Sequence, residues 1–318
     1  MLGFVAQASA YALRRPGLTP PRRLWRLLDT GLSDAARNMA LEQVLLDNRV
    51  NDNAPDTLHF LEFKPCVLLG YHQSADEEIH LDYCRRQGIE INRRISGGGC
   101  IYMDGGTLGW EIVAKKGADG IPGSLDAMYD RLCGGLIQAL AAFGITAAYR
   151  PLNDVEVAGR KVCGTGGADM EDSLIFHGSV LVAVKPEVMD EALKNPDKRY
   201  PSGQRAQTAR TAQIRQASQT GQTGQSGQMG ASVGAGQAAQ GGGAGPTAPA
   251  GLARSRVVGM DELLGYTPDM SEVKKHICGA FADLLGVDFL AGGLTGEEEE
   301  NLRRERPRFA SEEWIYRR

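Results

Sequence analysis

Residues 93–104 read RRISGGGCIYMD and directly follow residues 89–92, IEIN, which predict a short β-strand. The three successive glycines let main-chain N–H groups approach an anionic ligand closely, because no Cβ atoms stand in the way. The two arginines beside them can donate paired hydrogen bonds to a phosphate or carboxylate group. A tight hairpin turn is an equally good interpretation of the composition alone. The stretch is neither a Walker loop, which needs Gly-Lys-Ser or Gly-Lys-Thr, nor the dinucleotide-binding fingerprint.

A second segment, residues 153–167, reads NDVEVAGRKVCGTGG and predicts a β-hairpin. Residues 155–157 alternate as a strand, Ala158-Gly159 forms the turn, and Lys161 begins the return strand. A lysine in this position is ordinarily a solvated residue of a sheet edge. The glycines that follow Lys161 within three residues favour the alternative, close approach of a ligand to the backbone.

A third segment, residues 176–182, reads FHGSVLV and places His177 at the mouth of an apolar strand. A single histidine of this kind is usually a hydrogen-bonded residue of the core or its rim, and ligand binding is the alternative. No metal-binding spacing surrounds His177, so a zinc site is not expected.

Apolar patterns elsewhere predict strands and helices in mixed order, without the regular repeat of a doubly wound sheet. The expected strands are residues 25–28, 58–71 with a turn at Lys64-Pro65, 108–114, 155–157 and 173–184. The expected helices are residues 35–46 after Ser33 as N-cap, 76–87 ending at Gly88, 125–143 ending at Gly144, 261–264, 270–285 and a last helix with Trp314. The predicted fold class is α/β of the α+β type, a mixed central sheet flanked by helices.

A change of composition divides the chain. From residue 202 to residue 253 the sequence consists almost entirely of Gln, Gly, Ala, Ser and Thr, with few large apolar residues to drive burial. We expect an N-terminal extension (1–22), a main domain (23–200), a disordered insert rich in Gln, Gly and Ala (201–254) and a small C-terminal helical unit (255–318). The insert is interpreted as a flexible tether, with a binding segment as the alternative.

Charge and apolar content exclude several classes of function. The formal net charge of −4 disfavours a nucleic acid as the main partner. No apolar run approaches the roughly 20 residues that a membrane-spanning helix needs. The six cysteines are scattered without a Cys-x-x-Cys pair, which is typical of reduced thiols in a cytoplasmic protein.

The three segments, in this order and spacing, resemble the biotin and lipoate protein ligase superfamily, and within it the lipoate-protein ligase A family. The first resembles the family's Arg-Arg-x-Ser/Thr-Gly-Gly-Gly loop, the second its Asn-Asp and Gly-x-Lys-x-x-Gly segment, and the third its His-Gly-Ser/Thr strand. The resemblance extends to residues 24–46, with Asn38-Met39-Ala40, and to residues 257–314. It implies a biotin/lipoate ligase-like catalytic domain at residues 23–200.

The resemblance also implies an activity. ATP and Mg²⁺ would activate lipoate or octanoate as an acyl-adenylate, and the acyl group would pass to a lysine of a lipoyl carrier protein. That carrier would be a protein like the glycine-cleavage H protein or the lipoyl domain of a dehydrogenase complex. Lys161 would be catalytic, and Asp154 would hold the magnesium ion. The implied substrate- and ATP-binding residues are Arg94, Ser96, Gly97, Gly98, Gly99, Cys100, Tyr102, Asn153, Asp154, Gly164, Thr165, His177 and Gly178. A monomer is expected.

Two departures from the family pattern are visible. Met103 stands where many members have histidine, and residues 105–111, GGTLGWE, differ from the commoner Gly-Asn pattern. A similar variation occurs in ligases of sulfur-oxidising bacteria, which makes that subgroup a hypothesis for this chain.

Three rival functions stand beside the ligase. An octanoyl or lipoyl transferase would use a cysteine thiolate near the lysine. Residues 147–157, where similar transferases carry that cysteine, contain none, but Cys163 would share the face of Lys161 on a regularly alternating strand. A biotin ligase would usually show Gly-Arg-Gly in the glycine loop. A non-catalytic protein would bind lipoate or nucleotide without turnover.

Overall fold

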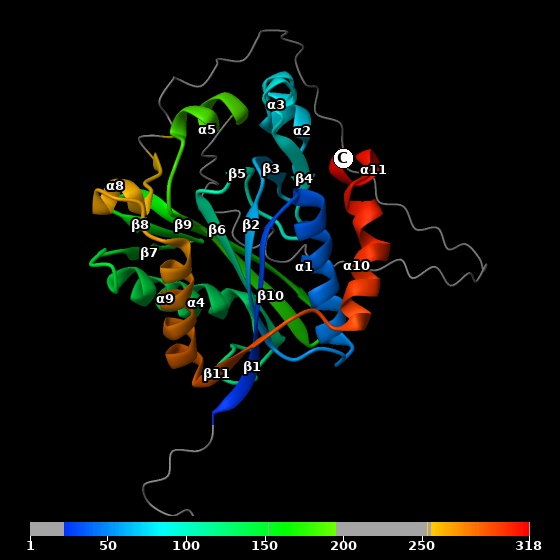
Figure 1. Cartoon of the computed structure of the whole chain (residues 1–318), viewed down its shortest axis with the longest axis vertical. Helices are drawn as coiled ribbons and strands as arrows, with labels where there is room; N and C mark the ends of the chain where they lie inside the picture. Colours follow the sequence, from blue (N-terminus) through cyan, green and yellow to red (C-terminus); the bar gives the residue numbers. More distant parts are fainter. Residues whose placement is uncertain (1–21, 152, 195–252, 254–255, 318) are drawn as a thin grey trace, which may run out of the picture.

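An eight-stranded sheet forms the centre of the computed structural model, which describes residues 22–151, 153–194, 253 and 256–317 (Figure 1). Its strand order is β11 (Val287–Gly292), β1 (Arg23–Ser33), β2 (Thr57–Phe63), β6 (Thr107–Lys115), β10 (Ser173–Leu181), β9 (Arg160–Met170), β8 (Asp154–Val157) and β7 (Ala148–Arg150). The pairs of β1 with β11 and β2 are parallel and the others antiparallel, which confirms the expected mixed sheet.

A smaller sheet lies beside the main one. Its order is β4 (Glu90–Arg93), β3 (Cys66–Leu69) and β5 (Ile101–Met103), so β3 separates the other two strands. The helices α2 (Ala75–Glu78), α3 (Leu81–Gln87) and α5 (Pro186–Ala192) contribute residues to the apolar cluster of this sheet. The expected N-terminal extension and insert lie outside the described residues, apart from Arg22 and Ala253.

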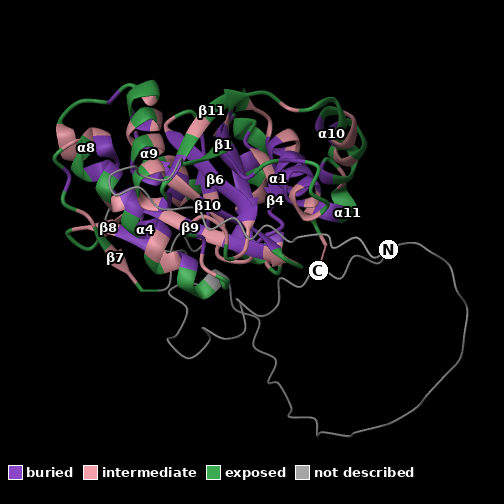
Figure 2. Cartoon of the chain, turned by 90° about the horizontal axis from the view of Figure 1, so that it is seen from below, coloured by how far each residue is buried: buried purple, intermediate pink, exposed green. Residues whose placement is uncertain are grey.

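Helices cover both faces of the main sheet (Figure 2). The helices α1 (Ala35–Val50) and α10 (Gly296–Phe309) lie on one face, and α4 (Leu125–Ala141) and α9 (Met270–Leu285) lie on the other. Alternate residues of β6 therefore enter two different cores: Trp110 packs under α4 and α9, and Val113 packs under α1. Because both faces of β6 are covered, every residue from Thr107 to Ala114 is buried, and most of them are apolar.

The helix ends explain where the sequence predictions were right and where they were wrong. Asp34, not Ser33, is the N-cap of α1, because β1 continues to Ser33 and the Asp34 side chain accepts from Arg37 N. The helix predicted at residues 76–87 is two helices, because Ile79 is extended and forms a β-bridge with Leu193. The left-handed Gly88 ends α3 as predicted.

The C-terminal segment contributes a strand that the sequence did not reveal. The strand β11 lies between α9 and α10 in the chain and pairs with β1 at the edge of the main sheet. Most of its side chains are at least partly exposed, so it lacks the apolar alternation that marks a strand. Arg26 of β1 and Glu298 of α10 then form a buried bidentate ion pair with both N···O distances at 2.7 Å. This segment therefore completes the sheet as well as covering it.

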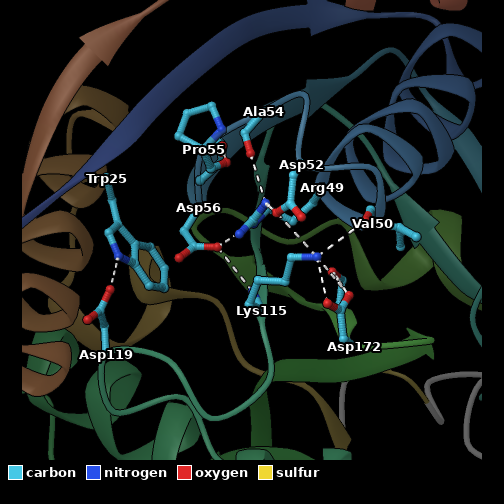
Figure 3. Close-up of polar contacts among 12 residues, drawn as sticks. Trp25, Arg49, Val50, Asp52, Ala54, Pro55, Asp56, Lys115, Asp119 and Asp172 are labelled. Atoms are coloured by element: carbon cyan, nitrogen blue, oxygen red, sulfur yellow. Dashed lines mark hydrogen bonds and ion pairs between the residues drawn. The ribbon is translucent and has the colours of Figure 1, made fainter. Parts of the chain in front are cut away.

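A polar network joins the end of α1 to the main sheet (Figure 3). Arg49 Nε donates to Asp56 Oδ1 at 2.6 Å, and the backbone N–H of Lys115 donates to the same oxygen at 3.1 Å. The Lys115 ammonium reaches Asp172 in the β9–β10 turn at 2.7 Å. Three elements are thus fixed at one corner of the molecule. Among the described helices, none has both the length and the apolar composition needed to cross a bilayer.

Candidate active site

The predicted hairpin carries Lys161 as expected. Ala158 and Gly159 form its turn, with φ values of 49° and 79°, between β8 and β9. Lys161 Nζ lies 2.9 Å from Asp154 Oδ1, and Asp154 also pairs with Arg150. The Lys161 side chain keeps 30% of its surface exposed, against 8% for Asp154. The ammonium is therefore positioned by a largely buried carboxylate and remains accessible from outside.

A β-bulge decides which residues share the face of Lys161. Val155 pairs with Cys163 and Glu156 pairs with Lys161, so Val162 is the extra residue on β9. The alternation shifts there, and Gly164 instead of Cys163 lies beside Lys161. A Cβ atom built on Gly164 would stand 2.4 Å from Lys161 Nζ. Glycine at this position thus leaves the space that the ammonium occupies.

The same face of β9 continues to the start of the glycine loop, which we define as residues 94–100. A Cβ on Gly166 would lie 3.0 Å from His177 Nε2 and 3.8 Å from Ser96 Oγ. Gly164 and Gly166 are successive positions on one strand face. Lys161 lies against position 164 of β9, and Ser96 of the glycine loop lies near position 166. Lys161 and the start of the glycine loop are therefore neighbours on one face of the same strand.

The glycine loop is not a tight hairpin. It connects β4 to β5, and these strands lie on opposite sides of β3. Gly98 has a φ of 103°, and a Cβ on Gly70 would stand 2.0 Å from the Gly98 carbonyl oxygen. Glycines are required here because two backbone segments pass in contact.

Two buried arginines hold this loop from behind. The Arg94 guanidinium donates to the carbonyl oxygens of Leu68, Gly97 and Gly99 at 2.9, 3.1 and 2.9 Å. Arg93 donates to six carbonyl oxygens, those of Gly70, Tyr71, Gln73, Trp314, Ile315 and Arg317. Burial, together with the charge of Arg317, lowers the pKa of Arg93 to about 10, so the group is still cationic at neutral pH. Arg93 also ties α11 (Glu312–Ile315) to the base of the loop.

Beneath the loop runs a chain of buried hydrogen bonds that we call the buried polar row. Ser96 Oγ lies 2.9 Å from His177 Nε2, and His177 Nδ1 lies 2.9 Å from Glu42 Oε1. Farther along, Glu111 Oε2 lies 3.0 Å from His59 Nδ1. Members of the row, in order, are Ser96, His177, Glu42, Glu111, His59 and Thr30. His59, Glu111 and His177 face one another across β2, β6 and β10.

The pKa values of the two carboxyl groups of the row are shifted in opposite directions. Burial raises the pKa of Glu111 well above its ordinary value, and the neighbouring Glu42 raises it further. Burial acts in the same direction on Glu42, but His177, a hydrogen bond from Glu111 and the charge of Arg94 together lower the Glu42 pKa below its ordinary value. Burial also lowers the pKa of His59 to about 3. These shifts favour the anion at Glu42 and the uncharged forms of Glu111 and His59.

The sequence analysis missed Glu42, Glu111 and His59. Each is a polar residue inside an otherwise apolar stretch, MALEQVLL, LGWEIVA and TLHFLEF respectively. A charged residue on the buried face of an element is the one signal that could have marked them. Together with His177, the two glutamates place one ligand atom each within 4.8 Å of the others, a spacing that would also suit a metal ion.

Other predicted site residues have local partners. Asn153 Nδ2 donates to the Thr165 carbonyl oxygen, and Thr165 Oγ1 donates to that of Asn153, both at 2.8 Å. The Tyr102 ring packs in the apolar cluster of the small sheet, and its hydroxyl donates to Asp104 at 3.3 Å. Gly178 lies on the face of β10 opposite to His177, where a Cβ would stand 2.7 Å from the Trp110 ring. In this structure, Tyr102 and Gly178 serve packing.

Met103, the departure from the family pattern, is buried in the core under α1. An apolar side chain suits this position, because its neighbours there include Met39 and Ile95.

The expectation that Cys163 shares the face of Lys161 is wrong, because the bulge turns Cys163 into the core under α4. Burial raises the pKa of its thiol far above the ordinary range. The other five cysteines behave alike: burial raises the pKa of Cys100 and Cys133 to about 12, and the pKa values of Cys66, Cys84 and Cys278 are raised as well. None of the six is an activated thiol, since activation requires a lowered pKa.

The sequence matches a known family and known relatives. Residues 34–225 match the family model of the lipoyl protein ligase A/B catalytic domain. The octanoyltransferase LipM of Moorella thermoacetica is 24% identical over 94% of this chain and 100% of its own length.

Two solved structures share the fold. The bipartite lipoate-protein ligase of the archaeon Thermoplasma acidophilum, studied with its E2 lipoyl domain, superposes with a TM-score of 0.65 at 21% identity. That alignment covers 92% of this chain and 96% of the other. A lipoate-protein ligase A with bound ATP superposes with a TM-score of 0.67 at 21% identity, over 93% and 98% of the two chains.

Proposed function

The chain belongs to the lipoyl protein ligase A/B catalytic-domain family, and from this premise we propose that it is an ATP-dependent lipoate-protein ligase. In the first step, the carboxylate of lipoate or octanoate attacks the α-phosphate of ATP, giving an acyl-adenylate and pyrophosphate. In the second, a carrier lysine attacks the acyl carbon and releases AMP. The product is a carrier protein with an amide-linked acyl group.

One observation carries this proposal: the Lys161 ammonium and the glycine loop stand over neighbouring positions on one face of β9. Attack of a carboxylate on a phosphate needs charge neutralisation and positioning more than it needs a protein nucleophile. Lys161 supplies a charge that can move from Asp154 to a phosphate or acyl oxygen. The loop supplies a backbone without side chains, against which a phosphate can lie closely.

Asp154 is the residue that we assign to Mg²⁺. This ion prefers oxygen ligands and is commonly bound by one or two protein carboxylates together with substrate phosphates. The Asp154 carboxylate is 8% exposed and lies next to Lys161, so it fits that requirement. The ion would neutralise phosphate charge there. Lys161 and Arg150 balance the carboxylate charge in the structure as it stands.

A thiol-dependent acyltransferase is the second candidate, because one relative that matches nearly the whole chain is named an octanoyltransferase. Such an enzyme needs a thiolate beside the lysine. The raised pKa values of all six cysteines, and the burial of Cys163 on the far side of β9, weigh against it. These observations support the ligase over the transferase.

For the partner, we propose a lipoyl carrier domain. The Thermoplasma ligase of similar fold was studied with its E2 lipoyl domain, which makes a dehydrogenase lipoyl domain or a glycine-cleavage H-like protein the first substrates to test. The sulfur-oxidation subgroup, the monomeric state and the cytoplasmic location stay predictions from the sequence.

The test is direct acylation of a carrier. The full chain is incubated with an apo lipoyl domain, lipoate or octanoate, ATP and MgCl₂, and the carrier is weighed by mass spectrometry. We expect a mass gain equal to one acyl group only when ATP is present. Acyl transfer from an octanoylated donor protein without ATP would establish the transferase instead. No transfer under either condition would favour a non-catalytic binding protein.

A further inference from the structure

The buried polar row meets the candidate site at one residue, His177. Its side chain keeps 11% of its surface exposed, whereas Glu42 keeps 3%, Glu111 keeps 1% and His59 keeps none. We propose that His177 is the proton acceptor for the carrier lysine in the second half-reaction, with Glu42 as its positioning residue. This inference rests on the proposed ligase function and adds a residue role to it.

Hydrogen-bond logic fixes the form of the imidazole ring. An ionised Glu42 can only accept, so His177 Nδ1 must carry the hydrogen of the 2.9 Å contact. In the neutral ring, Nε2 is then an acceptor, and Ser96 Oγ donates to it at 2.9 Å. The basic nitrogen of His177 therefore points towards Gly166 and the glycine loop, on the face that carries Lys161.

Glu111 maintains the charge of Glu42. A protonated Glu111 donates to Glu42 and accepts from His59 Nδ1 at 3.0 Å. Glu42 Oε2 has no hydrogen-bond partner that meets distance and angle criteria among the described residues, so we assign this proton to it. Glu42 can then remain ionised in a buried position and stabilise a positive charge on His177.

In the proposed step, a bond forms between the carrier lysine Nζ and the acyl carbon. The bond from that carbon to the AMP oxygen breaks, and its electron pair leaves with AMP. One proton passes from the attacking nitrogen to Ser96 Oγ while the Ser96 hydroxyl hydrogen passes to His177 Nε2, so Ser96 relays the proton to the imidazole. The resulting imidazolium has two hydrogens and two acceptors, since Nδ1 donates to Glu42 and Nε2 donates to Ser96 Oγ. The Ser96 hydroxyl thus changes from donor to acceptor without moving away.

Titratable and polar groups surround the ring on several elements. Glu42 faces it from α1, Glu111 from β6 and Ser96 from the glycine loop, while His59 stands behind Glu111. Arg94 adds a positive charge on the side of Glu42. A metal ion between Glu42, Glu111 and His177 is the competing interpretation, and it would require both carboxyl groups to be ionised.

The two half-reactions separate the roles. His177→Asn keeps a donor towards Glu42 but cannot accept a proton. We expect transfer from pre-formed lipoyl-adenylate to the carrier to fall on the order of 10²-fold at pH 7. The loss of lipoate-dependent ATP–pyrophosphate exchange should be at least tenfold smaller than the loss of transfer. The transfer defect should shrink as the pH rises towards the pKa of the carrier lysine, because hydroxide then deprotonates the amine.

Several outcomes would overturn the assignment. Equal losses in both half-reactions, or a transfer defect that does not change with pH, would reduce His177 to a support for the glycine loop. Full transfer activity in His177→Asn would remove it from the mechanism. An absence of exchange in the unaltered protein would count against the ligase function itself, so the two failures are distinguishable.

A matched pair of variants tests the carboxyl groups. Glu111→Gln keeps a neutral donor and acceptor in place, whereas Glu42→Gln removes the charge that holds the ring. We expect transfer to fall about tenfold more in Glu42→Gln than in Glu111→Gln. Equal losses, together with a stoichiometric metal found by elemental analysis in the unaltered protein and lost from both variants, would establish the metal site and refute the proposal.

Discussion

The glycine loop and the Lys161 hairpin lie over the same face of β9, but different forces hold them. Behind the loop, Arg93 and Arg94 donate into backbone carbonyl groups from buried positions. Lys161 is held by an ion pair with Asp154 that is partly open to solvent. A buried guanidinium cannot exchange its partners for water, whereas a half-exposed ammonium can. In the proposed site, the glycine loop would therefore be a rigid anion cradle and Lys161 an adjustable cation.

The largest effect should come from removing the support of the cradle. Arg93→Ala removes a donor from six carbonyl oxygens, of which only that of Gly70 keeps another donor among the described residues, the Gln73 N–H. We expect a loss of about 4 kcal/mol in the free energy of unfolding, measured by urea denaturation. Arg303→Ala is the control, because Arg303 is an exposed residue of α10. A loss below about 1 kcal/mol would show that the loop does not depend on this arginine.

Two glycine substitutions sharpen the comparison further. In Gly70→Ala, the new methyl group meets the backbone oxygen of Gly98, which cannot move without shifting the loop. We expect a loss of about 2–3 kcal/mol in stability. In Gly164→Ala, the methyl group meets the flexible end of Lys161 and lies at an ordinary contact distance of 3.7 Å from Asp154 Oδ1, so stability should change by less than about 1 kcal/mol. Turnover should nevertheless fall on the order of 10²-fold, because the ammonium is displaced.

Equal losses of stability in these two variants would contradict the distinction between a rigid loop and an adjustable lysine. Urea denaturation and the carrier acylation assay, applied to both proteins, provide the comparison.

The buried polar row lies beneath the glycine loop, and the raised pKa of its Glu111 predicts that protein stability depends on pH. The pKa of Glu111 is raised in the folded state, so protonated Glu111 contributes to stability. This contribution is complete when the pH is below the pKa of glutamate in the unfolded chain, about 4.3, and it is lost as the pH rises above that value. Glu111→Gln cannot ionise. As the pH rises, the free energy of unfolding of the variant should increase relative to that of the unaltered protein, by at most about 1.4 kcal/mol per pH unit. Urea denaturation at pH 5 to 8 measures this difference, and a constant gap would refute an uncharged Glu111.

The smallest effect on stability should come from changing the ion pair between Lys161 and Asp154. Asp154→Asn removes the charge that holds Lys161, but the partners are partly exposed, so we expect a change of about 1 kcal/mol or less. The concentration of Mg²⁺ needed for half-maximal activity should rise on the order of tenfold. A magnesium titration of both proteins checks this. An unchanged requirement would remove Asp154 from the metal site.

Local sequence chemistry predicted much of this molecule. The turn at Ala158-Gly159, the strands around Lys64-Pro65 and the helix stop at Gly88 all depend on a few adjacent residues. For the glycine loop, the composition alone left a close approach to the backbone and a tight hairpin equally open, and the contact between Gly70 and Gly98 excludes the hairpin. The family resemblance carried the order of the elements.

What the sequence could not show depends on pairing between distant segments. The bulge at Val162 exists only because β8 pairs with β9 in a shifted register, and it moves Cys163 from the site into the core. The buried polar row forms only when α1, β2, β6 and β10 are in place. The strand β11 is a short, exposed edge that pairs with β1 from the other end of the chain.

Lipoate-dependent ATP–pyrophosphate exchange in Lys161→Ala tests the central claim most directly, since it reports on the first half-reaction without any carrier. Lys275→Ala, which changes an exposed lysine of α9, is the control. The account predicts that exchange falls on the order of 10²-fold or more in Lys161→Ala and stays at the unaltered level in the control. Undiminished exchange in a folded Lys161→Ala protein would contradict it.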